Sequence, residues 1–161
     1  MRTVSRTTAL AAPAPAVWEQ ATQLAGVNAE LRPILRMTEP RGLRGATIAD
    51  LEPGVPAGRS WLLLGGILPV DYDDLCLAEI EPPRRFLERS RMLSMSGWQH
   101  ERVIEPSATG GCEVTDVLTF ALREPLRSIP GMEALAGRIV ARLFRHRHER
   151  LVAMHGSGSG G

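Results

Sequence analysis

A histidine and an aspartate stand on two neighbouring predicted strands, where they could act together on a proton. Both lie in the segment GWQHERVIEPSATGGCEVTDVLTF at positions 97–120, which reads as two strands joined by a short turn. A turn centred on 107–109 would pair Glu105 with Gly111, and the same register places His100 opposite Asp116. Side chains directly opposite each other have Cβ atoms about 4.5–5.5 Å apart. The sequence therefore predicts contact between the imidazole and the carboxylate.

Two interpretations of this pair stay open. In the structural one, Asp116 satisfies the polar atoms of His100 inside a core, because buried polar groups need hydrogen-bond partners. In the functional one, Asp116 orients His100, which then serves as a general acid or base toward a bound ligand. The residue types alone do not decide between these interpretations.

The alternation of side chains along a strand tells which residues share a face with this pair. On the strand 97–106, one face carries Trp98, His100, Arg102 and Ile104. On the strand 111–121, one face carries Val114, Asp116, Leu118 and Phe120. The second face is largely apolar, and we expect it to line a ligand cavity. We therefore take Trp98, Arg102, Leu118 and Phe120 as candidate ligand-binding residues.

A further strand, predicted at 84–93, adds three candidates. Its face with Phe86, Glu88 and Met92 is assigned to the cavity. Glu88 would then point inward, where an ionised carboxylate needs either Arg102 or a ligand as its partner. An ion pair at the rim of the sheet is the alternative for this glutamate.

The rest of the chain supplies the elements that must position these strands. Residues 2–10 predict an opening strand, and Pro13 and Pro15 suit the first turn of a helix that Gly26 would end. Next come a short helix at about 27–32, a strand at 34–39 and a long loop at 40–59. The loop holds a helical turn near 48–51 and could act as a lid. Strands are predicted at 60–70 and 72–81, with Gly65-Gly66 as a bulge or kink.

The segment GMEALAGRIVARLFRHRHERLVAMH at 131–155 predicts a closing amphipathic helix of about 24 residues. At 100° per residue its apolar face comprises Met132, Leu135, Ala136, Ile139, Leu143 and Met154. Ile139 and Leu143 are the candidates that would face a ligand. The fold class is therefore α+β: a helix-grip arrangement with a curved seven-stranded antiparallel sheet around this helix and two short helices after the first strand.

Composition narrows the function classes. The chain has 161 residues, a net charge of +1 and arginine as its only basic residue apart from histidine, so lysine Schiff-base chemistry and a lysine-dependent phosphate loop are excluded. Neither nucleic-acid binding nor an integral membrane segment is expected, and the chain reads as cytoplasmic. We expect one domain at 1–155, followed by an artificial linker, GSGSGG, at 156–161.

No metal site and no cofactor are expected. The acidic cluster Asp71, Asp73 and Asp74 has no calcium-loop spacing and reads as a solvated turn. The stretch HERLV at 148–152 lacks the second histidine of the zinc protease pattern. The basic run RHRHER at 145–150 reads as a solvated helix end. The alternative is that the stems of Arg147 and Arg150 cover core surface while their guanidinium groups reach carboxylates or a ligand at the cavity mouth.

Several segments together resemble the START-like (SRPBCC) superfamily, which includes polyketide cyclases and lipid-transfer domains. They are PAPAVWEQATQL, PPRRFLERS, the W-x-H-x-R pattern at 98–102, GGCEVTDVLTF and RLFRHRHERL, and the resemblance covers positions 1–155. It implies a helix-grip fold around a hydrophobic cavity. It implies no single reaction, because the superfamily contains both binding proteins and enzymes.

Three functions remain open from the sequence. The first is binding of a small hydrophobic ligand, such as a lipid, polyketide or isoprenoid, by a bacterial protein that is a monomer or a homodimer. The second is a cyclase- or dehydratase-type enzyme that uses His100 and Asp116 as an acid–base pair. The third is a protein-interaction module or an engineered scaffold.

Overall fold

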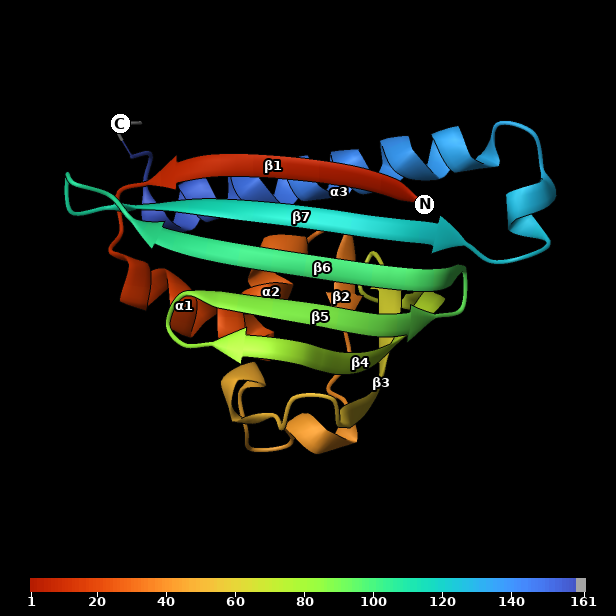
Figure 1. Cartoon of the computed structure of the whole chain (residues 1–161), viewed down its shortest axis with the longest axis horizontal. Coiled ribbons are helices and arrows are strands. Elements are labelled where there is room, and N and C mark those ends of the chain that lie inside the picture. Colours follow the sequence, from red (N-terminus) through yellow and green to blue (C-terminus); the bar gives the residue numbers. More distant parts are fainter. Residues whose placement is uncertain (159–161) are drawn as a thin grey trace.

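The computed structural model describes residues 1–158, and its main feature is one curled antiparallel sheet of seven strands in the order β1-β7-β6-β5-β4-β3-β2. Figure 1 shows β2 and β3 running steeply across the direction of β4 to β7. The strands are β1 (Arg2–Leu10), β2 (Leu35–Met37), β3 (Pro56–Leu64), β4 (Leu68–Glu81), β5 (Arg85–Met92), β6 (Met95–Pro106) and β7 (Cys112–Leu122). The predicted number of strands and their antiparallel pairing are confirmed.

Three α-helices lie on one side of this sheet (Figure 1). They are α1 (Ala14–Thr22), α2 (Leu24–Leu31) and the 24-residue α3 (Met132–His155). Short 3₁₀ turns are η1 (Arg41–Leu43), η2 (Ile48–Asp50) and η3 (Leu126–Ser128). The closing helix α3 packs against β1 and α2, so the α+β helix-grip fold is confirmed. In the described part of the chain, no helix combines the length and apolarity that a membrane crossing requires.

The break between the first two helices differs from the prediction. The first helix, α1, already ends at Thr22, and Gly26 lies inside the second helix, α2. A Cβ at position 26 would sit 1.8 Å from the carbonyl oxygen of Gln20. The side-chain Nε2 of Gln20 also donates a hydrogen bond to the Gly26 carbonyl oxygen at 2.9 Å. The glycine is therefore required for close packing of α1 on α2.

The curvature of the sheet arises at other positions than predicted. Gly65 and Gly66 form the tight turn between β3 and β4, with φ values of 60° and 82°, rather than a bulge within one strand. Register shifts occur instead between Leu62 and Leu63 in β3 and between Leu77 and Glu79 in β4. Such irregularities bend a strand and increase its twist, which curls this end of the sheet.

The register between β6 and β7 also differs from the prediction. Arg102 lies opposite Asp116, and His100 lies opposite Leu118, so the true register is shifted by two residues. The reason is that the turn is centred on Thr109, one residue later than predicted; the amide of Ser107 donates to the carbonyl of Gly111 across it at 2.9 Å. A shift of two keeps every side chain on its predicted face.

Residues buried on α3 form a different stripe from the predicted one. Ile139 is 59% exposed and Leu135 is 44% exposed, so neither faces the sheet. The buried face carries Ala136, Val140, Phe144, Arg147, His148 and Leu151. A helical projection that counts only apolar residues misses this face, because Arg147 and His148 belong to it. Both are buried because they have partners on other elements.

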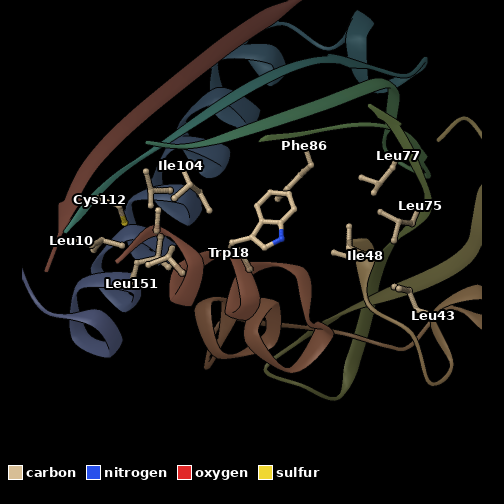
Figure 2. Packing of buried hydrophobic residues seen from close by; sticks show 14 of the residues in the cluster. Leu10, Trp18, Leu43, Ile48, Leu75, Leu77, Phe86, Ile104, Cys112 and Leu151 are labelled. Atoms are coloured by element: carbon tan, nitrogen blue, oxygen red, sulfur yellow. The ribbon is translucent and has the colours of Figure 1, made fainter. Parts of the chain in front are cut away.

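Two clusters of buried apolar side chains hold the helices on the sheet. One lies under α1 and the end of α3 (Figure 2), where the Trp18 and Phe86 rings have centroids 6.3 Å apart. The other gathers Leu118, Phe120 and Phe144 under the first half of α3. Burial of this apolar surface is the main driving force for closing the helices over the sheet.

Candidate functional site

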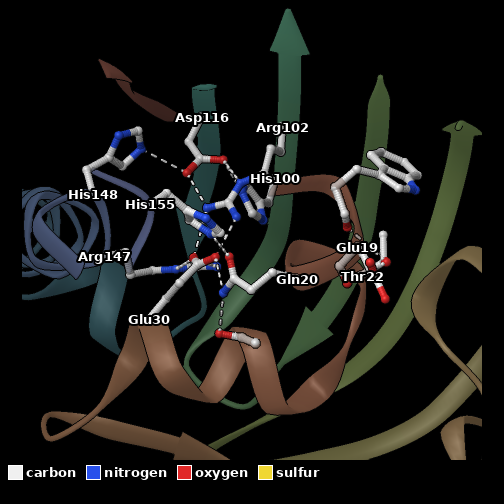
Figure 3. Close-up of polar contacts among 12 residues, drawn as sticks. Glu19, Gln20, Thr22, Glu30, His100, Arg102, Asp116, Arg147, His148 and His155 are labelled. Carbon is white, nitrogen blue, oxygen red and sulfur yellow. Dashed lines mark hydrogen bonds and ion pairs between the residues drawn. The ribbon is translucent and has the colours of Figure 1, made fainter. Parts of the chain in front are cut away.

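A buried ion network joins α2, the sheet and α3 (Figure 3). Arg102 on β6 donates from Nη1 and Nη2 to the two carboxylate oxygens of Glu30, at 2.8 and 3.0 Å. The same guanidinium donates from Nε and Nη2 to Asp116, at 2.8 and 2.7 Å. Arg102, Glu30 and Asp116 all have exposed fractions of 0%. Bidentate geometry on both sides compensates the cost of burying these charges.

Helix α3 completes the network. Arg147 donates from Nε and Nη2 to Glu30 Oε2, at 3.0 and 2.7 Å. His148 lies with Nε2 3.0 Å from Asp116 Oδ2 and with Nδ1 2.8 Å from the hydroxyl of Thr8. The expectation that the basic end of this helix is solvated is therefore wrong for Arg147 and His148, since carboxylates from α2 and β7 make their burial possible.

The electrostatics of the network favour its charged state. Burial alone would raise the pKa of Glu30, but Arg102 and Arg147 outweigh that effect and lower it. The pKa of Asp116 lies well below its usual value, because Arg102 and His100 overcome the burial penalty. Glu30 and Asp116 thus stay ionised, and they hold Arg102 as a cation.

His100 lies between this network and the interior of the grip. Its Nε2 is 2.9 Å from Asp116 Oδ1, so the expected contact is present, although the two residues are diagonal neighbours rather than direct partners. Its Nδ1 is 3.7 Å from Glu88 Oε2. The ring packs edge-on against Phe86 and Phe144. Burial opposes the charged ring, but Asp116 and Glu88 raise the pKa of His100 above its ordinary value.

Two further acidic side chains lie next to His100. Glu88 accepts a hydrogen bond from the hydroxyl of Ser90 at 2.7 Å, and it does not contact Arg102 as one interpretation had it. Asp73, expected in a solvated turn, is only 5% exposed because it lies on the inward face of β4. Burial and the charge of Glu88 raise the pKa of Asp73 well above its usual value. The pKa of Glu88 is lowered, because His100 overcomes its burial.

These side chains border a cavity of about 160 Å³ enclosed by the sheet, α2, α3 and the segment before β3. Most of its lining is apolar, and its polar lining residues are Asp73, Glu88, His100 and Arg147. Among the candidates from the sequence, those that line it are Phe86, Glu88, Met92, Trp98, His100 and Leu143. The helical turns at 41–43 and 48–50 contribute Leu43 and Ile48 to its wall.

The other candidates lie elsewhere. Arg102, Asp116, Leu118 and Phe120 are fully buried behind the cavity wall and do not line it. Ile139 points to solvent, which corrects its assignment to the ligand site. The predicted linker at 156–161 is partly described: Ser157 pairs with Leu10 of β1, and residues 159–161 lie outside the described residues.

Sequence reasoning missed Glu30, and it favoured solvated positions for Asp73 and Arg147. Glu30 is the only charged residue of the helix LAGVNAEL, and this lone carboxylate was the available signal of a buried partner. Its partners are 72 and 117 residues away in the chain, so no local pattern names them. Within residues 1–158 no three metal-ligating side chains gather in a way that could hold a metal ion.

This architecture can be compared with known proteins. Residues 8–155 match the family described as Domain of unknown function (DUF8410). The chain belongs to this family. No curated protein matches it.

Solved structures show that the DUF8410 chain has a START-like fold. Protein CV1439 from Chromobacterium violaceum superposes with a TM-score of 0.67 at 14% identity, over 97% of this chain and 99% of that one. The Zhui aromatase/cyclase from Streptomyces sp. R1128 superposes with a TM-score of 0.66 at 16% identity, over 95% of this chain and 92% of that one. A START superfamily protein from Mycobacterium smegmatis superposes with a TM-score of 0.61 at 13% identity, over 94% of this chain and 98% of that one. At these identities the similarity shows the fold alone.

Proposed function

We propose that this DUF8410 protein binds a small, largely apolar molecule in the cavity between the sheet, α2 and α3. The observation that carries the proposal is the composition of the cavity wall, where apolar side chains predominate and four polar ones are gathered. Pockets for small molecules combine an apolar lining with a few placed polar groups that fix orientation. Here Asp73, Glu88 and His100 lie on three adjacent strands, so a ligand would be oriented from the sheet side.

The volume of the cavity limits what it can hold. An apolar protein cavity of about 150 Å³ accommodates one benzene ring. The 160 Å³ found here corresponds to a ligand part of similar size. Leu35, Leu62 and Leu143 line the cavity and are only half-buried, so a longer molecule would extend past them toward solvent. A ring with a flexible or polar extension fits these limits.

Native mass spectrometry of the protein purified from cells, combined with a blocked variant, tests this function. Leu143→Trp adds bulk at a half-buried lining position and is expected to remove a co-purifying apolar ligand. Ile139→Trp is the matched control, because this position lies one turn earlier on α3 and is exposed. Equal loading of both variants, or no binding of any apolar probe, would contradict the proposal.

A second candidate function is proton transfer to or from the bound molecule, as in a cyclase- or dehydratase-type reaction. It is favoured by His100, which lines the cavity while Asp116 and Glu88 raise its pKa. A protonated ring held by two carboxylates is suited to act as a general acid. His100→Ala measured on a panel of polyketide-like compounds separates the functions: retained affinity with lost turnover supports the enzyme. Unchanged affinity with no turnover in either form supports binding alone.

A further inference from the structure

One atom on the cavity wall has no partner in the described structure. Asp73 lines the cavity with an exposed fraction of 5%, and its Oδ1 is buried without a hydrogen bond to any of residues 1–158. A buried oxygen of this kind costs free energy, because it has lost water and gained nothing in return. Native interiors keep few such atoms, and each calls for an explanation.

The neighbouring groups cannot supply the missing bond, because they are already engaged. The hydroxyl of Ser90 donates to Glu88 Oε1 at 2.7 Å, and the Ser90 oxygen accepts from the amide of Cys76 at 3.3 Å. The imidazole of His100 is directed at Asp116 and Glu88. Among the polar side-chain atoms of the wall that are buried from solvent, Asp73 Oδ1 is the one that lacks a hydrogen bond to residues 1–158.

The chemistry of the Asp73 carboxyl group decides which ligand group can bind at this position. Burial and the charge of Glu88 raise the pKa of Asp73, which favours the neutral acid over the carboxylate. Oδ1 can accept a hydrogen bond as a carboxylate oxygen or as the carbonyl oxygen of the neutral acid, and Asp73 borders a largely apolar cavity.

We propose that Asp73 Oδ1 recognises a hydroxyl group on a ring-containing apolar ligand, such as a phenol or an enol. This inference rests on the proposed binding function and adds the chemical class of the ligand. A hydroxyl fits because it donates a single hydrogen bond and carries no charge into the apolar cavity. A ligand carboxylate fits this position less well, since it would bring a second negative charge next to Glu88.

Three probes of similar shape test the inference: 2-naphthol, 2-methoxynaphthalene and naphthalene, titrated by calorimetry at neutral pH. One hydrogen bond to a buried acceptor should make 2-naphthol bind about 3- to 10-fold more tightly than the other two probes. Asp73→Leu should abolish this preference and leave the affinity for naphthalene unchanged or increased. Asp73→Asn, which keeps a carbonyl oxygen and can donate to Glu88, should retain the preference and guards against a folding defect in the leucine variant.

The matched control is Asp74→Leu, which removes the next carboxylate of β4. Asp74 is paired with Arg59 on the outer face of the sheet, so its loss should not change the preference. Equal affinities of the three probes for the natural sequence would overturn the inference while the binding function stands. A preference that survives Asp73→Leu would also overturn it. Failure of all three probes to bind would overturn the inference and the binding function together.

Discussion

Glu30 and Arg102 form two parallel hydrogen bonds, at 2.8 and 3.0 Å, that fasten helix α2 to the middle of the sheet. Arg147 joins them from α3, and Asp116 joins them from β7. The charges of two guanidinium groups and two carboxylates therefore compensate one another, and all four side chains are buried. The network lies directly behind His100 and fixes the ring at the cavity wall through Asp116. Arg147 also lines the cavity, whereas Glu30, Arg102 and Asp116 serve the site by holding other groups in position.

Loss of Glu30 should destabilise the fold strongly. Glu30→Gln leaves Arg102 and Arg147 buried with only one carboxylate between them, and breaking a buried pair in this way costs about 3–5 kcal/mol. Urea unfolding followed by circular dichroism measures the change in the free energy of unfolding. Glu19→Gln, on the exposed side of α1, is the control that should stay within about 0.5 kcal/mol. A loss below about 1 kcal/mol for Glu30→Gln would show that the network contributes little.

Stability should fall as the pH rises through the folded-state pKa of His100. That pKa is raised above 6.5, so the stabilising contribution of the protonated ring is complete below pH 6.5 and disappears at higher pH. The charges facing the ring are Asp116 and Glu88, which favour protonation, and Arg147, which opposes it. Asp116 and Glu30 have lowered pKa values, and their contribution is lost only when the pH falls below their ordinary values of 3.8 and 4.5.

This pH dependence can be measured by urea unfolding at pH about 6 and about 8. Asp73 also has a raised pKa, and its ionisation destabilises the fold in the same direction, so the comparison is made in the background of Asp73→Asn. Adding His100→Gln should flatten the remaining dependence above pH 6.5. A titration midpoint of the His100 imidazole below 6.5 by nuclear magnetic resonance would show that the sign is wrong.

Gly26 should not tolerate a methyl group. Its Cβ would meet the Gln20 carbonyl oxygen at 1.8 Å, and both backbones would have to move apart. We expect Gly26→Ala to cost about 1–3 kcal/mol, typical of overpacking, and to lower ligand affinity because α2 lines the cavity. Gly97→Ala is the matched control, since the nearest atom to its added Cβ is 3.9 Å away. Equal thermal midpoints for the two variants would contradict this account.

The orientation of α3 predicts opposite outcomes for two apolar residues. Phe144 is 2% exposed, and Phe144→Ala should destabilise the protein by about 3–5 kcal/mol. Ile139 is 59% exposed, and Ile139→Ala should change the free energy of unfolding by no more than about 0.5 kcal/mol. Chemical denaturation of both variants checks the difference. A large cost at Ile139 would indicate that the sequence-based helix face was correct after all.

Much of the fold could be predicted because strands and long helices carry local signals. The strand at 2–10 and the closing helix ending at His155 have the predicted bounds, and the strand faces holding Phe86, His100 and Asp116 point inward as expected. Alternation alone decides such faces, and a register error of two residues leaves them unchanged. Because a shift of two residues leaves both side chains on the same face, His100 and Asp116 are still in contact although the predicted register is wrong.

From the sequence alone one can tell which side chains of the strands point into the grip, because that follows from the two-residue period of a strand. The buried face of α3 and the charges that meet in the interior depend on the tertiary fold. Glu30 comes from α2, Arg147 from α3 and Asp73 from β4, and each is buried by groups that lie far from it in the chain. The physical reason is that burial of a charge depends on a compensating partner in space, and chain order does not encode that distance.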